Sequence, residues 1–374
     1  MIKAHGKFKV PSMRRSSRVY LNDLNPGKAA VVKDFLRRSR DITQFFVDLF
    51  WQRQDLSAAL ADIDTVHRAC DRFGISTRLA QALAKQAKEV VRSTESRRKD
   101  TGTRKRKPRL RNRVVTLYSH FVRVEPFRGA FDHALILGGA GVPKVVIPCK
   151  STCHLNTKLR DGWVLGNTIR LGRSGDRLFV DFIVEKPRPA LKMQGRCLGL
   201  DSNYKNGLTT SAGQFIGKDT YARIQAFGRR QKNTKAEIKS LMFHALKSLD
   251  LSDVRVLAIE DLRHVRSGTR GKFPRRLNRR MSHWLYGAYS IWLQQRCEES
   301  GIRLERKDPW KTSQRCAACG KWDRRSRKGD VFLCVFCGHS DHADLNSPKN
   351  LEALALAEVY GLRQLPNPIP YGLG

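Results

Sequence analysis

Acidic residues and long apolar runs are what this sequence has least of. It holds 34 Asp and Glu against 72 Lys and Arg among 374 residues, so its formal net charge is +38. No stretch approaches the roughly 18 consecutive apolar residues that a membrane helix needs, and the first residues lack the apolar core of a signal peptide. Both absences argue against membrane insertion and secretion, and we expect a cytoplasmic protein with no membrane partner.

The positive charge itself points to a polyanionic partner. A surplus of this size repels itself in a compact fold, and nucleic acid is the commonest compensating polyanion. The charge is densest in residues 97–113, with ten Lys or Arg and one acid, and in residues 263–280, with eight and none. Either segment can be a solvated loop, but we expect both to contact phosphates. The residues expected to contact nucleic acid are Arg97, Arg98, Lys105, Arg106, Lys107, Lys205, Arg270, Lys272, Arg275, Arg276, Arg279 and Arg280.

The nine cysteines are an odd number with uneven spacing, so a disulfide framework is not expected. Four of them form two Cys-x2-Cys pairs separated by fourteen residues, and a glycine follows each pair. This spacing is typical of a structural zinc ribbon, in which four thiolates close the coordination shell. We therefore predict one non-catalytic zinc ion and do not expect the nearby His339 and His342 to be ligands. The predicted ligands are Cys316, Cys319, Cys334 and Cys337.

Hydrophobic periodicity divides the chain into three regions. Helical spacing of apolar residues predicts helices over residues 29–51 and 76–91. Short apolar or alternating runs in residues 114–187 predict a small β-barrel or sandwich. The C-terminal half alternates strand and helix signals, which is typical of an α/β layer. Its predicted strands cover residues 197–200, 254–259 and 302–306, and its predicted helix covers residues 281–300.

Three carboxylates stand at the ends of predicted elements in this half. Asp201 and Glu260 each end a strand, and Asp344 stands where a helix begins. Taken singly, they could be a turn residue, a salt-bridge partner and a helix N-cap. Taken together, they can converge at one end of an RNase H-like sheet and hold two Mg²⁺ ions about 3.5–4 Å apart. Such ions would activate water and stabilise the leaving 3′ oxygen in phosphodiester hydrolysis.

Four motifs together resemble the transposon-encoded TnpB proteins, which are relatives of the type V CRISPR effectors. The motifs are Gly199-Leu200-Asp201 with Asn206, the block Ala258-Ile259-Glu260-Asp261-Leu262, the ribbon opening Thr312-Ser313-Gln314-x-Cys316-x2-Cys319-Gly320, and Asp344-x-Asn346 followed by Lys349-Asn350-Leu351. Their order is specific, because a nuclease domain is interrupted by a zinc ribbon before its last acid. Residues 195–355 carry the resemblance.

The resemblance implies a multidomain α+β protein. An N-terminal β-barrel wedge domain would hold a helical recognition insertion, and a C-terminal RNase H-like (RuvC) α/β domain would be interrupted by the zinc ribbon. The expected segments are residues 1–20 (first wedge strand), 21–95 (helical recognition lobe), 96–113 (basic linker), 114–190 (wedge β-barrel), 195–307 (first RuvC segment), 308–340 (zinc ribbon), 341–360 (second RuvC segment) and 361–374 (flexible tail).

Family members are RNA-guided DNA endonucleases, and the resemblance implies the same activity here. The implied partners are one transposon-end guide RNA per protein and a double-stranded DNA target beside a short recognised motif. Asp201, Glu260 and Asp344 would hold two Mg²⁺ ions, and the four cysteines one Zn²⁺ ion. The basic segment after Glu260 would form a lid over the DNA, and the protein would associate with a prokaryotic nucleoid. The interval between Asp201 and Glu260 is shorter than in the family, which implies a trimmed helical insertion.

Three other classes of protein remain open on sequence alone. A nuclease-inactive, RNA-guided repressor should have lost one acid, whereas this chain keeps all three. An unguided RuvC-like nuclease or transposase accessory protein would need no recognition lobe. A structural zinc-ribbon binder of nucleic acid would leave the spaced acids unexplained. Trp310 and Trp322 can stack on bases in their basic surroundings, but we expect them to pack in the core or support the ribbon.

Overall fold

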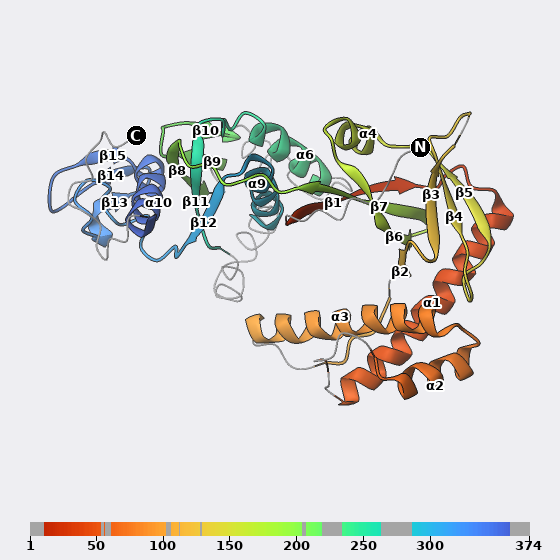
Figure 1. Cartoon of the computed structure of the whole chain (residues 1–374). Coiled ribbons are helices and arrows are strands. Elements are labelled where there is room, and N and C mark those ends of the chain that lie inside the picture. Colours follow the sequence, from red (N-terminus) through yellow and green to blue (C-terminus); the bar gives the residue numbers. More distant parts are fainter. Residues whose placement is uncertain are drawn as a thin grey trace. The chain divides into compact units, whose positions relative to one another are not determined.

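The computed structural model has two compact units, Met1–Pro187 and Arg188–Gly374, and each has a hydrophobic core of its own (Figure 1). The structure describes residues 11–53, 56, 61–101, 106–111, 113–127, 129–203, 207–218, 234–262 and 286–359. The predicted tail, residues 361–374, and the basic segment of residues 263–280 lie outside these ranges. None of the described helices combines the length and apolarity that a bilayer crossing requires.

The first unit contains the two helices that periodicity predicts. They are α1 (Pro26–Arg53), which extends past both predicted ends, and α3 (Thr77–Thr101), which extends past the predicted C-terminal end. The apolar face of each lies in the core, where Phe46 and Leu83 are fully buried. Because α3 continues to Thr101, the basic residues Arg97 and Arg98 are helical.

A third helix, α2 (Ile63–Phe73), is not predicted from the apolar spacing. Its ends nevertheless carry ordinary capping residues. The Asp62 side chain accepts a hydrogen bond from the Thr65 N–H, and Gly74 ends the helix in the left-handed conformation with φ 62°. A segment that is capped at both ends can therefore form a helix even where its hydrophobic pattern is short.

Two antiparallel sheets complete the first unit. One has the order β1-β7-β6-β2 and the other β3-β4-β5. The β6–β7 hairpin pairs over most of its length, and β1 pairs with β7 along its full length. A short helix, α4 (Cys153–Arg160), precedes β6. The strands are β1 (Ser12–Tyr20), β2 (Val114–Tyr118), β3 (Val122–Pro126), β4 (His133–Leu137), β5 (Val145–Cys149), β6 (Val164–Ser174) and β7 (Arg177–Pro187).

The second unit is built on a five-stranded mixed sheet with the order β10-β9-β8-β11-β12. β8, β11 and β12 are parallel to one another, whereas β9 and β10 run antiparallel as successive hairpins from β8. The three strands predicted in this half are confirmed. The strands are β8 (Arg196–Asn203), β9 (Gly207–Thr210), β10 (Phe215–Ile216), β11 (Val254–Glu260) and β12 (Arg303–Lys307).

Helices cover both faces of this sheet (Figure 1). On one face, Leu198 and Leu200 of β8 pack against Leu293 in a cluster with α6 (Thr234–Leu246) and α9 (Tyr286–Ser300). On the other face, Cys197 packs against Leu351 of α10 (Ala343–Val359). This three-layer arrangement confirms the predicted α/β layer, and it leaves the odd-numbered residues of β8 facing α10.

Between β12 and α10 lies a small ribbon with a three-stranded antiparallel sheet and its own buried cluster, which includes Cys316 and Phe332. Its elements are the 3-10 helix η1 (Arg324–Ser326) and the strands β13 (Arg327–Lys328), β14 (Val331–Leu333) and β15 (Ser340–His342). Since β15 leads directly into α10, the ribbon is joined to the helix that covers the sheet.

Candidate active site and metal centre

The sheet places Asp201 and Glu260 side by side. Side chains alternate between the faces of a strand. In β8, Gly199 and Asp201 therefore share the face that α10 covers. In β11, Ala258 packs toward α10, so Glu260 faces the same way. Leu200 and Ile259 are register partners in these parallel strands, which brings the next residues, Asp201 and Glu260, to the same end of the sheet.

Asp344 joins them because α10 packs very closely on β8. A Cβ atom added at Gly199 would lie 1.8 Å from the carbonyl oxygen of Pro348, so only glycine permits this approach. Asp344, in the first turn of α10, is 3% exposed, and Asp201 is 7% exposed. Three segments far apart in the sequence thus bring the three predicted acids to one end of the sheet.

Burial and nearby negative charge raise the pKa of both Asp201 and Glu260. Burial raises the pKa of Asp201 to about 6, and the charge of Asp344 contributes to the rise. Burial, followed by the charge of Asp201, raises the pKa of Glu260 to about 8. At neutral pH Glu260 therefore holds a proton and can donate it in a hydrogen bond to Asp201. A bound cation would remove this repulsion, so the three-oxygen donor set suits a hard divalent ion such as Mg²⁺.

Two residues that sequence reasoning misses contact these acids. The Thr312 hydroxyl donates a hydrogen bond to Glu260 Oε1 at 2.6 Å. The Arg327 guanidinium donates to Asp344 Oδ1 at 3.0 Å. Thr312 lies within the ribbon opening that the resemblance already marks, whereas no local pattern singles out Arg327. Both residues belong to the ribbon, which therefore contributes side chains to the acidic site.

Two asparagines of α10 fix the chain that carries Thr312. The Asn346 side chain donates to the Arg315 carbonyl at 2.7 Å and accepts from the Ala317 N–H at 2.9 Å. The Asn350 side chain donates to the carbonyls of Thr312 and Arg315 at 3.1 and 2.8 Å. Both asparagines are fully buried. The helix that holds Asp344 therefore also holds the loop that orients Glu260.

The four predicted cysteines meet in one cluster. Their sulfur atoms all lie within 4.8 Å of one another. The Sγ atoms of Cys316 and Cys337 are 3.7 Å apart, and those of Cys319 and Cys334 are 3.6 Å apart. Tetrahedral bonds of about 2.3 Å to zinc would place sulfur atoms at nearly this separation. The thiols can therefore hold one metal ion, and their number and softness suit zinc.

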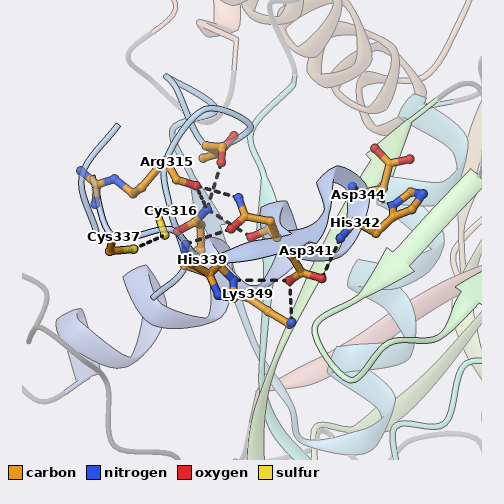
Figure 2. Close-up of polar contacts among 12 residues, drawn as sticks. Arg315, Cys316, Cys337, His339, Asp341, His342, Asp344 and Lys349 are labelled. Carbon is orange, nitrogen blue, oxygen red and sulfur yellow. Dashed lines mark hydrogen bonds and ion pairs between the residues drawn. The ribbon is translucent and has the colours of Figure 1, made fainter. Parts of the chain in front are cut away.

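Figure 2 shows His339 and Asp341 between the labelled cysteines and His342, while His342 and Asp344 lie away from the cysteines. Asp341 lies between His339, at 3.8 Å, and Lys349, at 2.7 Å. His342 Nδ1 accepts from the Asp344 N–H at 3.1 Å. Within the described ranges, the four thiols are the one set of three or more potential ligand atoms that meets so closely. The three carboxylates are more loosely gathered, since Asp344 pairs with Arg327.

Four of the residues predicted to contact nucleic acid lie within the described ranges. Arg98 pairs with Glu95 at 3.1 Å, and Lys107 pairs with Asp48 at 3.0 Å. Arg97 lies beside Arg98 on α3, and Arg106 is exposed. These four residues belong to the first unit. The remaining predicted residues lie outside the described ranges, namely Lys105, Lys205, Arg270, Lys272, Arg275, Arg276, Arg279 and Arg280.

The two ribbon tryptophans correct a prediction. Trp310 is 63% exposed and Trp322 is 43% exposed, so neither packs in a core as expected. Their rings instead contact each other edge to face, with centroids 5.8 Å apart. Core packing is therefore wrong, because an indole is apolar enough to suggest burial, whereas its position in the ribbon depends on turns that the hydrophobic pattern does not specify. The alternative expectation, that the tryptophans support the ribbon, stays a prediction.

Comparison with known proteins supports the resemblance, and the matching family model lies within the second unit. The family model described as "Cas12f1-like, TNB domain" matches residues 286–351, which contain the ribbon. The chain is 36% identical to the CRISPR-associated endodeoxyribonuclease Cas12f1 of Sulfoacidibacillus thermotolerans over 75 residues, which is 20% of this chain and 18% of that protein. It is 30% identical to a TnpB-like protein of Aquifex aeolicus (strain VF5) over 107 residues, 28% and 34% of the two chains. The resemblance to TnpB proteins and type V effectors is confirmed in these segments.

The matched segments span well under two thirds of both curated relatives. Among solved structures, a Cas12f1-sgRNA-target DNA complex is similar with a TM-score of 0.49 and 12% identity, over 88% of this chain and 83% of that one. CasPhi-2 (Cas12j) bound to crRNA is similar with a TM-score of 0.42 and 10% identity, over 96% and 100%.

Proposed function

We propose that this protein is an RNA-guided DNA endonuclease with one RuvC active site formed by Asp201, Glu260 and Asp344. The observation that carries the proposal is the convergence of these acids at one end of the sheet, beside the ribbon that matches the Cas12f1-like family model. The strand order, with two antiparallel hairpin strands on one side of β8 and two parallel strands on the other, supports an RNase H-like domain.

Each residue of the site has a role in this proposal. Asp201, Glu260 and Asp344 would hold two Mg²⁺ ions, which supply an activated water and stabilise the leaving oxygen when bound. Thr312 orients the Glu260 carboxylate through its hydrogen bond. Arg327 holds Asp344 and reduces the repulsion among the acids. The four thiols would hold zinc and maintain the ribbon from which Thr312 and Arg327 extend.

The partners follow from the relatives and from the charge. We propose that a net charge of +38 serves to bind a transposon-end guide RNA and double-stranded target DNA, with one protein per guide. The two sheets of the first unit would form the wedge domain and its helices the recognition lobe. Base pairing would select the target, while the protein would read a short motif beside it.

Sequencing the RNA that co-purifies with the protein, expressed with its native flanking DNA, tests the guided activity. The proposal predicts one structured RNA ending in a variable segment, and exchanging that segment should redirect cleavage to a matching plasmid. A heterogeneous mixture that follows cellular RNA abundance, with cleavage that ignores the segment, would instead favour an unguided RuvC-like nuclease. An intact guide complex that binds its target without cutting would favour an RNA-guided repressor.

A further inference from the structure

Two buried hydroxyl groups on the α10 side of the sheet have no hydrogen-bond partner. They belong to Thr209 of β9, which is 0% exposed, and to Ser347 of α10, which is 1% exposed. Among the residues that the structure describes in the second unit, no other fully buried hydroxyl lacks a hydrogen bond. A hydroxyl in this state destabilises a protein, because folding removes its hydrogen bonds to water and supplies none in return.

The sheet register places Thr209 beside Asp201. The two residues are directly opposite each other in the antiparallel pair of β8 and β9. Opposite residues extend their side chains from the same face of a sheet, with Cβ atoms about 4.5–5.5 Å apart. Asp201 faces α10, and α10 packs on β9 as well as on β8. The Thr209 side chain is therefore enclosed between the sheet and α10, next to the Asp201 carboxyl.

The helix brings Ser347 to the same carboxyl. Ser347 follows Asp344 by three residues, so both side chains lie on one side of α10. Its neighbour Pro348 is the residue whose carbonyl oxygen packs against Gly199. Burial raises the pKa of Asp201, and the Ser347 hydroxyl is close enough to the carboxyl to offset part of that rise. The Ser347 Oγ nevertheless makes no hydrogen bond of regular geometry.

An ionised Asp201 would supply the acceptor that both hydroxyls lack. One carboxyl oxygen, Oδ1, already accepts from the Ser202 N–H at 2.8 Å. Two carboxylate oxygens can accept about four hydrogen bonds, so acceptor positions remain for both hydroxyls. Hydrogen bonds to a carboxylate are roughly twice as strong as those between neutral groups. Ionisation of Asp201 beside a bound cation would therefore favour both bonds.

We infer that Thr209 and Ser347 are positioning residues, whose hydroxyls donate to the Asp201 carboxylate in the cation-bound protein and hold it in the orientation that binds the ion. This inference rests on the proposed function, which requires the cation. The hydroxyls act through Asp201 and need no contact with the ion, as is usual for groups that orient a metal ligand. The inference predicts that they destabilise the cation-free protein and strengthen cation binding.

Thermal unfolding with and without Mg²⁺ separates this role from an ordinary structural one. The full chain is freed of nucleic acid, kept with its zinc bound and titrated with Mg²⁺, so neither guide nor cleavage is needed. Thr209→Val and Ser347→Ala each remove one unpartnered hydroxyl. Each variant should melt at a higher temperature than the wild type without Mg²⁺. Each should also need about 10- to 100-fold more Mg²⁺ for half-maximal stabilisation.

Thr210→Val is the matched control. Thr210 is 1% exposed and lies in the same strand, on the opposite face, and its Oγ1 accepts from the Gln214 N–H at 3.0 Å. Because this hydroxyl has a partner, its removal should lower the melting temperature without Mg²⁺ and leave the Mg²⁺ dependence unchanged. Thr209→Ser retains the hydroxyl and should keep the Mg²⁺ dependence of the wild type.

A lower melting temperature with unchanged Mg²⁺ dependence, in Thr209→Val and Ser347→Ala alike, would show that the hydroxyls are only structural and would overturn the inference. A higher melting temperature with unchanged Mg²⁺ dependence would also overturn it, because the hydroxyls would then stay unpartnered beside the ion. If both variants weaken Mg²⁺ binding while the guide-loaded wild type does not cut DNA, the proposed function fails and the positioning role stands. If the wild type cuts DNA and both variants bind Mg²⁺ normally, only this inference fails.

Discussion

Thr312 shows how a single hydroxyl connects the ribbon to the acids. Its hydrogen bond to Glu260 favours the ionised carboxylate, which is the form that binds a cation. Thr312→Val keeps the shape of the side chain and removes the hydroxyl, which contacts Glu260 and also the Pro309 carbonyl at 3.2 Å. We expect the variant to bind Mg²⁺ or to cleave DNA about 10- to 100-fold less well.

Titration of cleavage against Mg²⁺ concentration measures this effect. Thr43→Val is the matched control, since Thr43 is also buried and donates to a backbone carbonyl, that of Ser39 at 2.7 Å, in the first unit. Equal activity of Thr312→Val and the wild type at every Mg²⁺ concentration would show that Thr312 does not orient Glu260.

The raised pKa of Glu260 predicts how stability depends on pH. Without a cation, the folded protein holds a proton on Glu260 up to about pH 8, whereas the unfolded chain releases it near pH 4.5. The stability that this protonation contributes is therefore lost as pH rises from about 4.5 to 8. Thermal unfolding without added Mg²⁺, with zinc kept bound, should show a falling melting temperature across this window, and Mg²⁺ should restore it most strongly at the upper end. Glu260→Gln should flatten the decline, and an unchanged decline would contradict the assigned pKa.

The three acids could be predicted because each stands at the end of a recognisable element. Asp201 and Glu260 follow apolar strands, and helical periodicity begins after Asp344. Thr312 and Arg327 could not, because their contacts span 52 and 17 residues of sequence and depend on how the ribbon folds. The exposure of the tryptophans was missed for the same reason.

At the scale of elements, the approach of α10 to β8 depends on Gly199. Any Cβ atom at this position would collide with the Pro348 carbonyl oxygen. Gly199→Ala should therefore force α10 away from the sheet, lower the free energy of unfolding by at least about 1–3 kcal/mol and separate Asp344 from Asp201. Urea unfolding and the Mg²⁺-induced shift in melting temperature measure the two consequences.

Gly287→Ala provides the matched glycine control. Gly287 lies in α9, and a Cβ atom there would have no neighbour within 4 Å. Alanine should be neutral or stabilise this helix by up to about 1 kcal/mol. If both alanine variants behave alike, close packing at Gly199 does not hold the site together.

The ribbon makes a prediction about metal removal. Cys334→Ser should reduce bound zinc from about one ion per chain and disorder the ribbon, because structural zinc supplies the folding energy of such small domains. Since Thr312 and Arg327 extend from the ribbon, DNA cleavage should fall with the zinc content. Cys153→Ser is the control, because Cys153 is an exposed cysteine of the first unit. Full cleavage by a zinc-free variant would show that the acids need no support from the ribbon.

Helices and strands with a long or simple hydrophobic pattern could be predicted from the sequence. Elements whose ends depend on capping or turn residues could not. The predicted strands 254–259 and 302–306 agree with β11 and β12 within a residue or two. The first is a largely apolar run, as is typical of a buried parallel strand, whereas β12 is mostly charged and its agreement has no such reason. α2 was missed because its apolar stripe, Ile63, Val66, Ala69 and Phe73, is short, although the caps Asp62 and Gly74 mark both of its ends. Register and strand order depend on contacts between distant segments, which a single sequence does not show.

At the scale of the whole molecule, a strongly positive chain contains a buried cluster of acids. A net charge of +38 favours nucleic acid around the protein, whereas the carboxyl groups of Asp201, Glu260 and Asp344 gather at one buried point. A phosphodiester would be repelled from that point unless cations intervene. This opposition of charges is consistent with the Mg²⁺-dependent cleavage that we propose.

The central claim is that Asp201, Glu260 and Asp344 form the site that cuts DNA. A guide-programmed cleavage assay of Asp201→Ala tests it most directly. The purified complexes of wild type and variant receive the same guide RNA and a matching plasmid, with and without Mg²⁺. We predict that the wild type cuts only with Mg²⁺, and that Asp201→Ala binds guide and target with unchanged affinity yet does not cut. Cleavage by Asp201→Ala at the wild-type rate would contradict the proposed site.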